Sequence, residues 1–497
     1  MRAPCFVLLL LLSTCTTSAA AQETPELVAD SSIRVVGTRG ADAHAFTIQS
    51  SILGERRRVN VVFPASYISS PPGRRYPVTI VLDGEIQLPA TAAVADELAR
   101  HGLIPETILV AIENAGGTRG RVRDLTPPGL SVSGSSLNEG GDRFLDFIER
   151  ELLPAAERQW RAAEPRTIIG HSSGAILATY AAATRATFRA VVALDPPIVL
   201  GENWLARKLV ERAAAPLAPL RYASFESRFG WPEESWRTLV TTAPPSWRLY
   251  RETLRLEGHE TLVMLGAYLG LREVFSDFSR LAVQELPAAE VLSYYAGLSD
   301  SLGTSVPPPE PVLRNVVDDL LAEGRGAGAR AAYDLLVQAY GAPSNAAELL
   351  AELVDAEARP EPAETVASLL ATPFPTPDEA SPFIGDWVGS QWMSPDEPRH
   401  NRLTLRIRVE AGRVVAELLN PTAPPDLRVR KVDYLRVTPG GLTYGILNGM
   451  RPRGVVLWEG KLEGDTLSGR QRWGGVAPPY PPGANVDPGF SFKRTAR

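Results

Sequence analysis

The stretch that decides the fold is Arg166-Thr167-Ile168-Ile169-Gly170-His171-Ser172-Ser173-Gly174. An apolar strand pattern at 166–169 opens it, and a helix-forming run at 175–183 follows. Two glycines flank the G-x-S-x-G serine and allow the tight turn that presents Ser172 at a strand end. The N-terminus of the following helix points backbone N–H groups at the same place. The stretch therefore predicts a serine nucleophile on a strand–turn–helix elbow.

A serine hydroxyl is a weak nucleophile and needs a histidine base, which in turn needs an orienting carboxylate. In folds with this elbow, the acid and then the histidine follow the serine along the chain. Two histidines follow Ser172, namely His259 and His400. His259 lies on a polar turn before the helical pattern at 261–275 and is predicted to be the base. His171, beside the serine, is interpreted as structural.

The carboxylate is less certain in sequence than the histidine. Glu226 follows a plausible strand at 220–225, lies 54 residues after the serine and 33 before His259, and is the predicted acid. Other carboxylates also lie between the serine and the histidine. The rivals are Glu233, Glu234 and Asp195.

An acyl-transfer reaction also requires backbone N–H groups that bind an oxyanion. The residue after the nucleophile supplies one of them in such folds, which here is Ser173. The other comes from the loop after an earlier strand, and this loop begins at 82–85 in the present chain. The predicted second donor is the amide of Gly84 or of Glu85.

Continuous apolar runs separated by helical periods indicate a sheet that is buried on both faces. The runs lie at 78–82, 107–112, 166–169 and 190–194, and residues 142–153 have helical spacing. Strands that alternate with helices imply βαβ units and a parallel sheet. The fold class predicted for residues 22–285 is therefore α/β, with a central sheet and flanking helices.

The remainder of the chain changes character twice. Residues 286–372 are rich in Ala, Leu and Glu and predict a helical segment, either packed on the α/β part or similar to a degenerate tetratricopeptide repeat. A Pro-rich linker at 373–380 follows. Residues 381–497 then show strand periodicity with regular glycine turns, as at 403–409, and predict a small antiparallel β-barrel.

The composition excludes several classes of protein. The chain has 497 residues, of which 44% are hydrophobic and 22% charged, so it can form packed cores. Its formal net charge of −6 gives no basic excess for nucleic-acid binding. With only Cys5 and Cys15, a disulfide framework or a zinc–thiolate site is excluded. No cofactor or metal is expected.

The N-terminus has the order of a secretory signal. Arg2 precedes an apolar run at 6–12, and Ala19-Ala20-Ala21 provides a small-residue cleavage site. The prediction is a signal peptide at 1–21 and a secreted or periplasmic protein. Cys15 offers a rival lipoprotein site. No other stretch is apolar enough to cross a membrane.

Further motifs resemble the esterases related to enterochelin esterase and esterase D, within the α/β-hydrolase superfamily. They are the entry segment at 50–57, the strand and turn at 76–84, Arg123-Asp124-Leu125-Thr126-Pro127, the helix at 144–154, the elbow and Gly258-His259-Glu260. The resemblance implies a secreted serine esterase for a small-molecule ester, and some such relatives work with a Ser–His pair. Asp195-Pro196-Pro197 departs from the family pattern.

The frame at 383–389 and the later turns around 464 resemble the lipocalin-like barrels that follow secreted bacterial hydrolases. Two other functions remain open. An acyl-enzyme could pass its acyl group to an alcohol rather than to water, or the esterase scaffold could serve as a binding protein. The substrate, for instance a siderophore ester or an acylated sugar, is not decided by the sequence.

Overall fold

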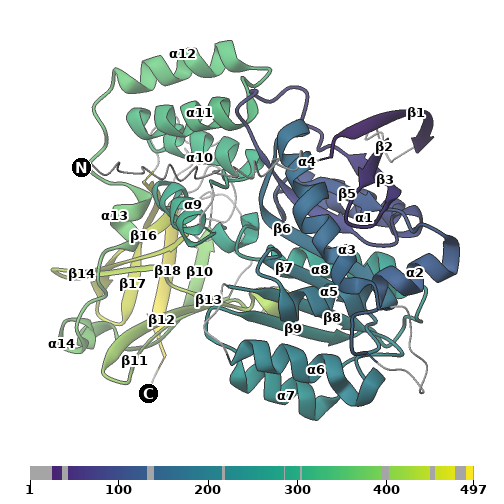
Figure 1. Cartoon of the computed structure of the whole chain (residues 1–497). Coiled ribbons are helices and arrows are strands. Elements are labelled where there is room, and N and C mark those ends of the chain that lie inside the picture. The colour runs from purple at the N-terminus through teal and green to yellow at the C-terminus, as the bar shows by residue number, and fades with distance from the viewer. Residues whose placement is uncertain are drawn as a thin grey trace, which may run out of the picture.

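The computed structural model describes residues 25–35, 43–130, 139–214, 219–284, 286–302, 305–392, 402–447, 454–475 and 489–495 (Figure 1). The predicted signal peptide, with Cys15, lies outside the described residues, as does His400. No helix in the described ranges is long and apolar enough to cross a membrane.

The first sheet has nine strands in the described part of the chain, in the order β1-β2-β3-β5-β4-β6-β7-β8-β9. Strands β4 to β9 are mutually parallel, and β1 to β3 join them in antiparallel pairing. Strands β4, β5 and β7 are buried along their whole length, which explains their continuous apolar runs. The predicted α/β sheet is therefore confirmed. The strands are Leu27–Val35, Ala43–Ser50, Glu55–Val62, Tyr76–Val81, Ile108–Ile112, Ala162–His171, Ala190–Leu194, Arg221–Glu226 and Arg248–Thr253, for β1 to β9 in chain order.

The expected entry strand at 50–57 is instead a hairpin turn. Strand β2 ends at Ser50, β3 begins at Glu55, and Gly54 has a φ of 73° in the turn between them. The positive φ suits glycine because it has no Cβ. Only the second half of the predicted strand pairs within the sheet.

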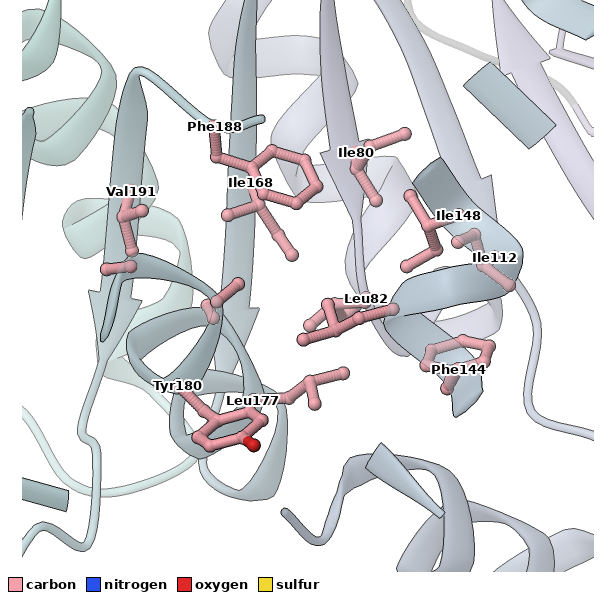
Figure 2. Close-up of a cluster of buried hydrophobic side chains, with 14 of the residues drawn as sticks. Ile80, Leu82, Ile112, Phe144, Ile148, Ile168, Leu177, Tyr180, Phe188 and Val191 are labelled. Atoms are coloured by element: carbon pink, nitrogen blue, oxygen red, sulfur yellow. The ribbon is translucent and has the colours of Figure 1, made fainter. Parts of the chain in front are cut away.

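Helices cover both faces of this sheet. Figure 2 shows one face, where Ile80 and Ile168 from the strands meet Leu177 of α5 and Phe144 of α3. Helices α1 and α8 cover the opposite face. The helices of this part are Gly84–Arg100, Gly117–Leu125, Gly141–Phe147, Leu153–Gln159, Ser173–Thr184, Leu200–Ala213, Glu233–Thr242 and Leu262–Val274, for α1 to α8.

The predicted helical segment packs on the same face as α1 and α8. Val316, Ala332 and Leu353 belong to the hydrophobic cluster that contains Leu88 of α1 and Leu271 of α8. A break was expected at 324–328, and the structure ends one helix at Ala322 and begins the next at Gly326. This arrangement is the one expected for helices packed on the α/β part. The helices are Ala288–Leu302, Glu310–Ala322, Gly326–Tyr340 and Ala346–Glu357, for α9 to α12.

The C-terminal part forms a second, curled antiparallel sheet, drawn in light green and yellow in Figure 1. Its described strands follow the order β13-β12-β11-β10-β18-β17-β16-β15-β14. The end strands β13 and β14 are consecutive in the chain: β13 pairs with β12, and β14 pairs with β15. One bent segment thus joins the two ends of the sheet, as a barrel requires. The strands are Gly385–Trp392, Leu403–Glu410, Arg413–Leu419, Val429–Lys431, Tyr434–Thr438, Gly441–Leu447, Val455–Glu463, Thr466–Gly474 and Gly489–Arg494, for β10 to β18.

Two short helices, α13 (Val366–Leu370) and α14 (Pro377–Ala380), precede the curled sheet. Val366 and Leu369 of α13 share a hydrophobic cluster with Leu457 of β16. Arg472 of β17 also forms an ion pair with Glu364, with Nη1 2.7 Å from Oε1. Helix α13 thus packs on the barrel side of the predicted Pro-rich linker. We therefore propose a division near residue 360 rather than at 372.

Candidate functional site

The candidate site lies at the carboxyl edge of the parallel strands. Strands β4, β6 and β7 are each followed by a non-glycine residue with positive φ, and the values are 53° for Asp83, 57° for Ser172 and 48° for Asp195. Such φ values are uncommon outside glycine and gather at functional turns. Because β4, β6 and β7 are neighbours in the sheet, these three residues stand side by side along its edge.

Ser172 occupies the sharp turn between β6 and α5. Its amide donates to the Leu194 carbonyl at 2.9 Å, and its side chain is half-buried. A Cβ at Gly170 would lie 2.3 Å from the Gly174 carbonyl oxygen, so only glycine permits the chain to turn this closely. The predicted strand–turn–helix geometry is present.

His259 is oriented by a carboxylate. Its Nδ1 lies 2.6 Å from Oδ2 of Asp195, a fully buried side chain. Because a carboxylate only accepts, Nδ1 carries the proton and Nε2 keeps a lone pair. The Phe229 ring packs edge-on against the imidazole with centroids 5.1 Å apart. His259 can therefore act as a base through Nε2.

Asp195 is held by several donors besides His259. The amides of Ser227 and Phe229 donate to its Oδ1 at 2.6 and 3.0 Å, and the Ser227 hydroxyl donates to Oδ2 at 3.0 Å. Burial raises the pKa of Asp195, but the hydrogen bonds from Ser227, His259 and Phe229 outweigh burial and leave this pKa below its ordinary value. The carboxylate is therefore ionised at neutral pH.

The structure does not place Glu226 beside His259. Glu226 is buried at the end of β8, where its Oε2 accepts from Arg251 Nε at 2.9 Å and its Oε1 accepts from the Trp231 amide at 2.9 Å. Glu233 also faces Arg251, at 3.0 Å. Of the carboxylates considered from the sequence, Asp195 is the one that contacts the histidine, and we propose it as the acid in place of Glu226.

His171 has a contact that the sequence did not reveal. Its Nε2 donates to the His259 carbonyl at 2.7 Å, and the two imidazole rings lie 4.5 Å apart. Burial is the largest effect on the pKa of His171 and lowers it, so the ring is neutral at pH 7. Since His171 directly precedes Ser172, this hydrogen bond ties the histidine loop to the serine turn.

The two predicted oxyanion donors lie at neighbouring helix N-termini. Gly84 begins α1 and Ser173 begins α5, and first-turn N–H groups lack intrahelical acceptors. A Cβ at Gly174 would lie 3.4 Å from Cβ of Leu82, which shows how closely the two turns approach. A Cβ at Gly84 would meet the Ala111 backbone at 2.7 Å, so this position also requires glycine. The amides can serve an oxyanion between them.

No group of three or more His, Cys, Asp or Glu side chains in the described ranges is arranged to hold a metal ion.

A mixed sheet with helices on both faces and a serine at the β6–α5 turn defines the α/β-hydrolase type of fold. Residues 50–252 match the family model described as "Putative esterase". The structure is also similar to an IroE-like serine hydrolase from Shewanella oneidensis, with 26% identity and a TM-score of 0.51 over 59% of this chain and 98% of that one. The predicted resemblance is thus confirmed, and with it the class of enzyme, a hydrolase that acts on esters.

Two further solved structures are similar over the same part of the chain. Siderophore hydrolase EstA from Aspergillus nidulans has 17% identity and a TM-score of 0.41, over 48% of this chain and 95% of that one. The enterobactin and salmochelin hydrolase IroE has 18% identity and a TM-score of 0.38, over 47% and 93%. No curated protein sequence matches the chain.

Proposed function

We propose that the protein is a secreted serine esterase that cleaves a carboxylic ester through an acyl-enzyme on Ser172. The observation that carries this proposal is the 2.6 Å contact between His259 Nδ1 and Asp195 at the sheet edge that also bears the serine turn. A buried, ionised carboxylate stabilises the imidazolium that forms when the histidine accepts a proton. The predicted signal at 1–21 supports secretion.

In the first half of the reaction, Ser172 Oγ bonds to the ester carbonyl carbon and its proton passes to His259 Nε2. The carbonyl oxygen becomes an oxyanion, which the amides of Ser173 and Gly84 stabilise. The bond to the alcohol oxygen then breaks, and the histidine proton passes to the leaving alcohol. An acyl group remains on Ser172.

In the second half, water takes the place of the alcohol. His259 Nε2 removes one water proton as the water oxygen bonds to the acyl carbon, and the same two amides bind the second oxyanion. Collapse of this intermediate returns the proton to Ser172 and releases the carboxylic acid. The cycle needs no metal or redox partner, since every proton passes through one imidazole.

Fluorophosphonate labelling of the purified protein tests the proposal directly. Such a reagent phosphonylates an activated serine, so one adduct per chain is expected, on the peptide that contains Ser172. Prior heat denaturation should abolish labelling, because the unfolded chain has no elbow. An adduct on Ser173, or no adduct on folded protein, would refute the assignment.

A shortened protein that ends at Pro360 should retain turnover of p-nitrophenyl acetate within about threefold of the full chain, because every proposed catalytic group lies upstream. This end point leaves α13 out, so Val366 and Leu369 are not exposed without their barrel partners. Circular dichroism should first establish that the shortened protein is folded. A folded but inactive product would mean that the curled sheet completes the site.

A further inference from the structure

Arg121, on α2, connects the two turns that carry the proposed oxyanion donors. Its Nε and Nη2 donate to Oδ1 and Oδ2 of Asp83 at 2.7 and 2.9 Å, a two-pronged ion pair. Its Nη1 lies 3.3 Å from the hydroxyl of Ser173. One guanidinium group therefore contacts the residue before Gly84 and the residue after Ser172.

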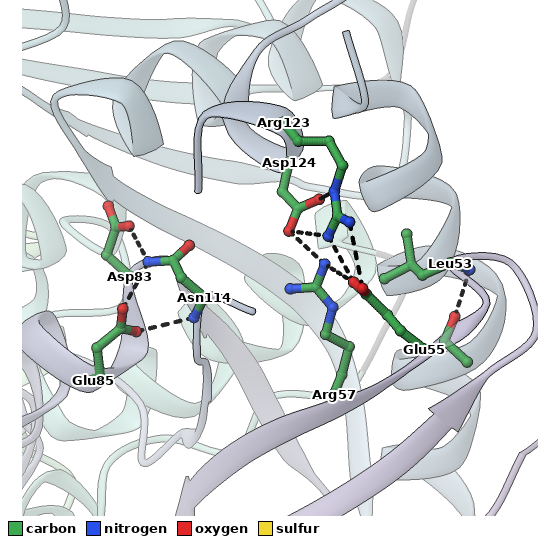
Figure 3. A network of polar contacts seen from close by, with 9 residues as sticks. Leu53, Glu55, Arg57, Asp83, Glu85, Asn114, Arg123 and Asp124 are labelled. Carbon is green, nitrogen blue, oxygen red and sulfur yellow. Dashed lines mark hydrogen bonds and ion pairs between the residues drawn. The ribbon is translucent and has the colours of Figure 1, made fainter. Parts of the chain in front are cut away.

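The Asp83 carboxylate is buried in a confined position. Its side chain is 2% exposed, and Asn114 Nδ2 also donates to Oδ1 at 2.7 Å. Figure 3 shows Asn114 between Asp83 and Glu85, where its amide nitrogens also reach Glu85 at 2.8 and 3.2 Å. A carboxylate this far from water is costly unless a cation and further donors compensate it.

The same carboxylate packs against the start of α5. A Cβ placed on Gly174 would lie 3.2 Å from Oδ2 of Asp83. Asp83 itself has a left-handed φ of 53°, so the loop relies on its contacts to keep this conformation. The carboxylate therefore fills the space between the two helix N-termini, and its position sets their spacing.

We propose that Arg121 is a positioning residue that fixes the distance between the Gly84 and Ser173 amides and neutralises the Asp83 carboxylate beside the oxyanion. The inference rests on the proposed esterase function. An unneutralised carboxylate at this place would oppose the negative charge that develops on the substrate oxygen. Because the guanidinium uses three N–H groups in a fixed plane, lysine cannot reproduce the arrangement.

The test compares Arg121→Gln and Arg121→Lys with the control Arg119→Gln, which changes an exposed arginine on the same helix. For p-nitrophenyl acetate, Arg121→Gln should lower kcat by about 10²-fold with KM within about threefold of wild type. Arg121→Lys should lose less, because it keeps the charge. The control should match wild type.

A second readout separates positioning from a general loss of structure. Phenylboronic acid accepts the Ser172 oxygen at boron and becomes a tetrahedral anion with an oxygen in the oxyanion position. Its inhibition constant should rise in Arg121→Gln by the same factor as kcat/KM falls, measured well below the thermal midpoint. A merely structural role would lower the thermal midpoint without this proportionality.

Three outcomes would overturn the inference: kcat and the boronate inhibition constant within twofold of wild type in Arg121→Gln, a raised KM with unchanged kcat, or losses in the Arg119→Gln control as large as those in Arg121→Gln. If Arg121→Gln does not fold, Arg121→Lys decides between the same outcomes. A wild-type protein that neither turns over the ester nor reacts with a fluorophosphonate would instead refute the proposed function, so the two failures are distinguishable.

Discussion

Replacing Ser172 with alanine is expected to lower kcat for a short p-nitrophenyl ester by about 10⁶-fold, because the atom that forms the acyl bond is removed. The fold should be unaffected, since the turn is held by backbone bonds that alanine keeps. These are the bonds from the Ser172 amide to Leu194 and from the Ile176 amide to Ser172, at 2.9 and 3.1 Å. The thermal midpoint should therefore move by less than about 2 °C.

Ser173→Ala provides the matched control for this experiment. It removes a neighbouring hydroxyl but keeps the backbone amide that is proposed to bind the oxyanion. Only the 3.3 Å contact with Arg121 is lost, so the rate should fall by no more than about tenfold. Wild-type turnover in Ser172→Ala, or equal losses in the two variants, would show that another group is the nucleophile.

The sequence predicted the elbow and the sheet well because both depend on local patterns. Continuous apolar runs mark strands that are buried on both faces, and β7 occupies the predicted 190–194. Glycine spacing around Ser172 reports a backbone requirement that any structure of this kind must meet, as the clash predicted at Gly170 shows. Such features can be read from neighbouring residues alone.

The acid could not be chosen from the sequence because chain order does not report reach. Asp195 and Glu226 both lie between the serine and the histidine and both end parallel strands. The difference arises from three-dimensional contacts: the amides of Ser227 and Phe229 turn toward Asp195, whereas Arg251 on the adjacent strand takes Glu226. Neither contact leaves a local sequence signal.

The curled sheet shows a similar limit. Strands near 427–432 and 435–437 were predictable from their alternation, and β13 and β14 lie there. Their pairing with two different partners, β12 and β15, depends on a bend that the alternation does not encode. The same is true of α10 and α11, whose apolar faces were predictable but whose shared core with α1 and α8 was not.

Asp195→Asn and Glu226→Gln separate the two carboxylates by experiment. Asp195→Asn should lower kcat by about 10⁴-fold, because an amide neither stabilises the imidazolium nor holds the required tautomer of His259. Glu226→Gln should cost less than about tenfold in kcat, since this residue supports the loop after β8 rather than the histidine. It should instead lower the thermal midpoint by several degrees, through about 1–3 kcal/mol lost at Arg251.

The pH dependence of stability gives an independent check on Asp195. Its pKa in the folded protein lies below the ordinary value, so ionised Asp195 adds stability above the unfolded-state pKa of about 4. That contribution is lost as the pH falls through the lower folded-state pKa. The stability difference between wild type and Asp195→Asn, measured by urea unfolding, should therefore be full at pH 7 and shrink below about pH 4. A large kcat loss in Glu226→Gln together with near-normal turnover in Asp195→Asn would reverse the assignment, and near-normal turnover in both would leave Ser172 and His259 as a catalytic pair.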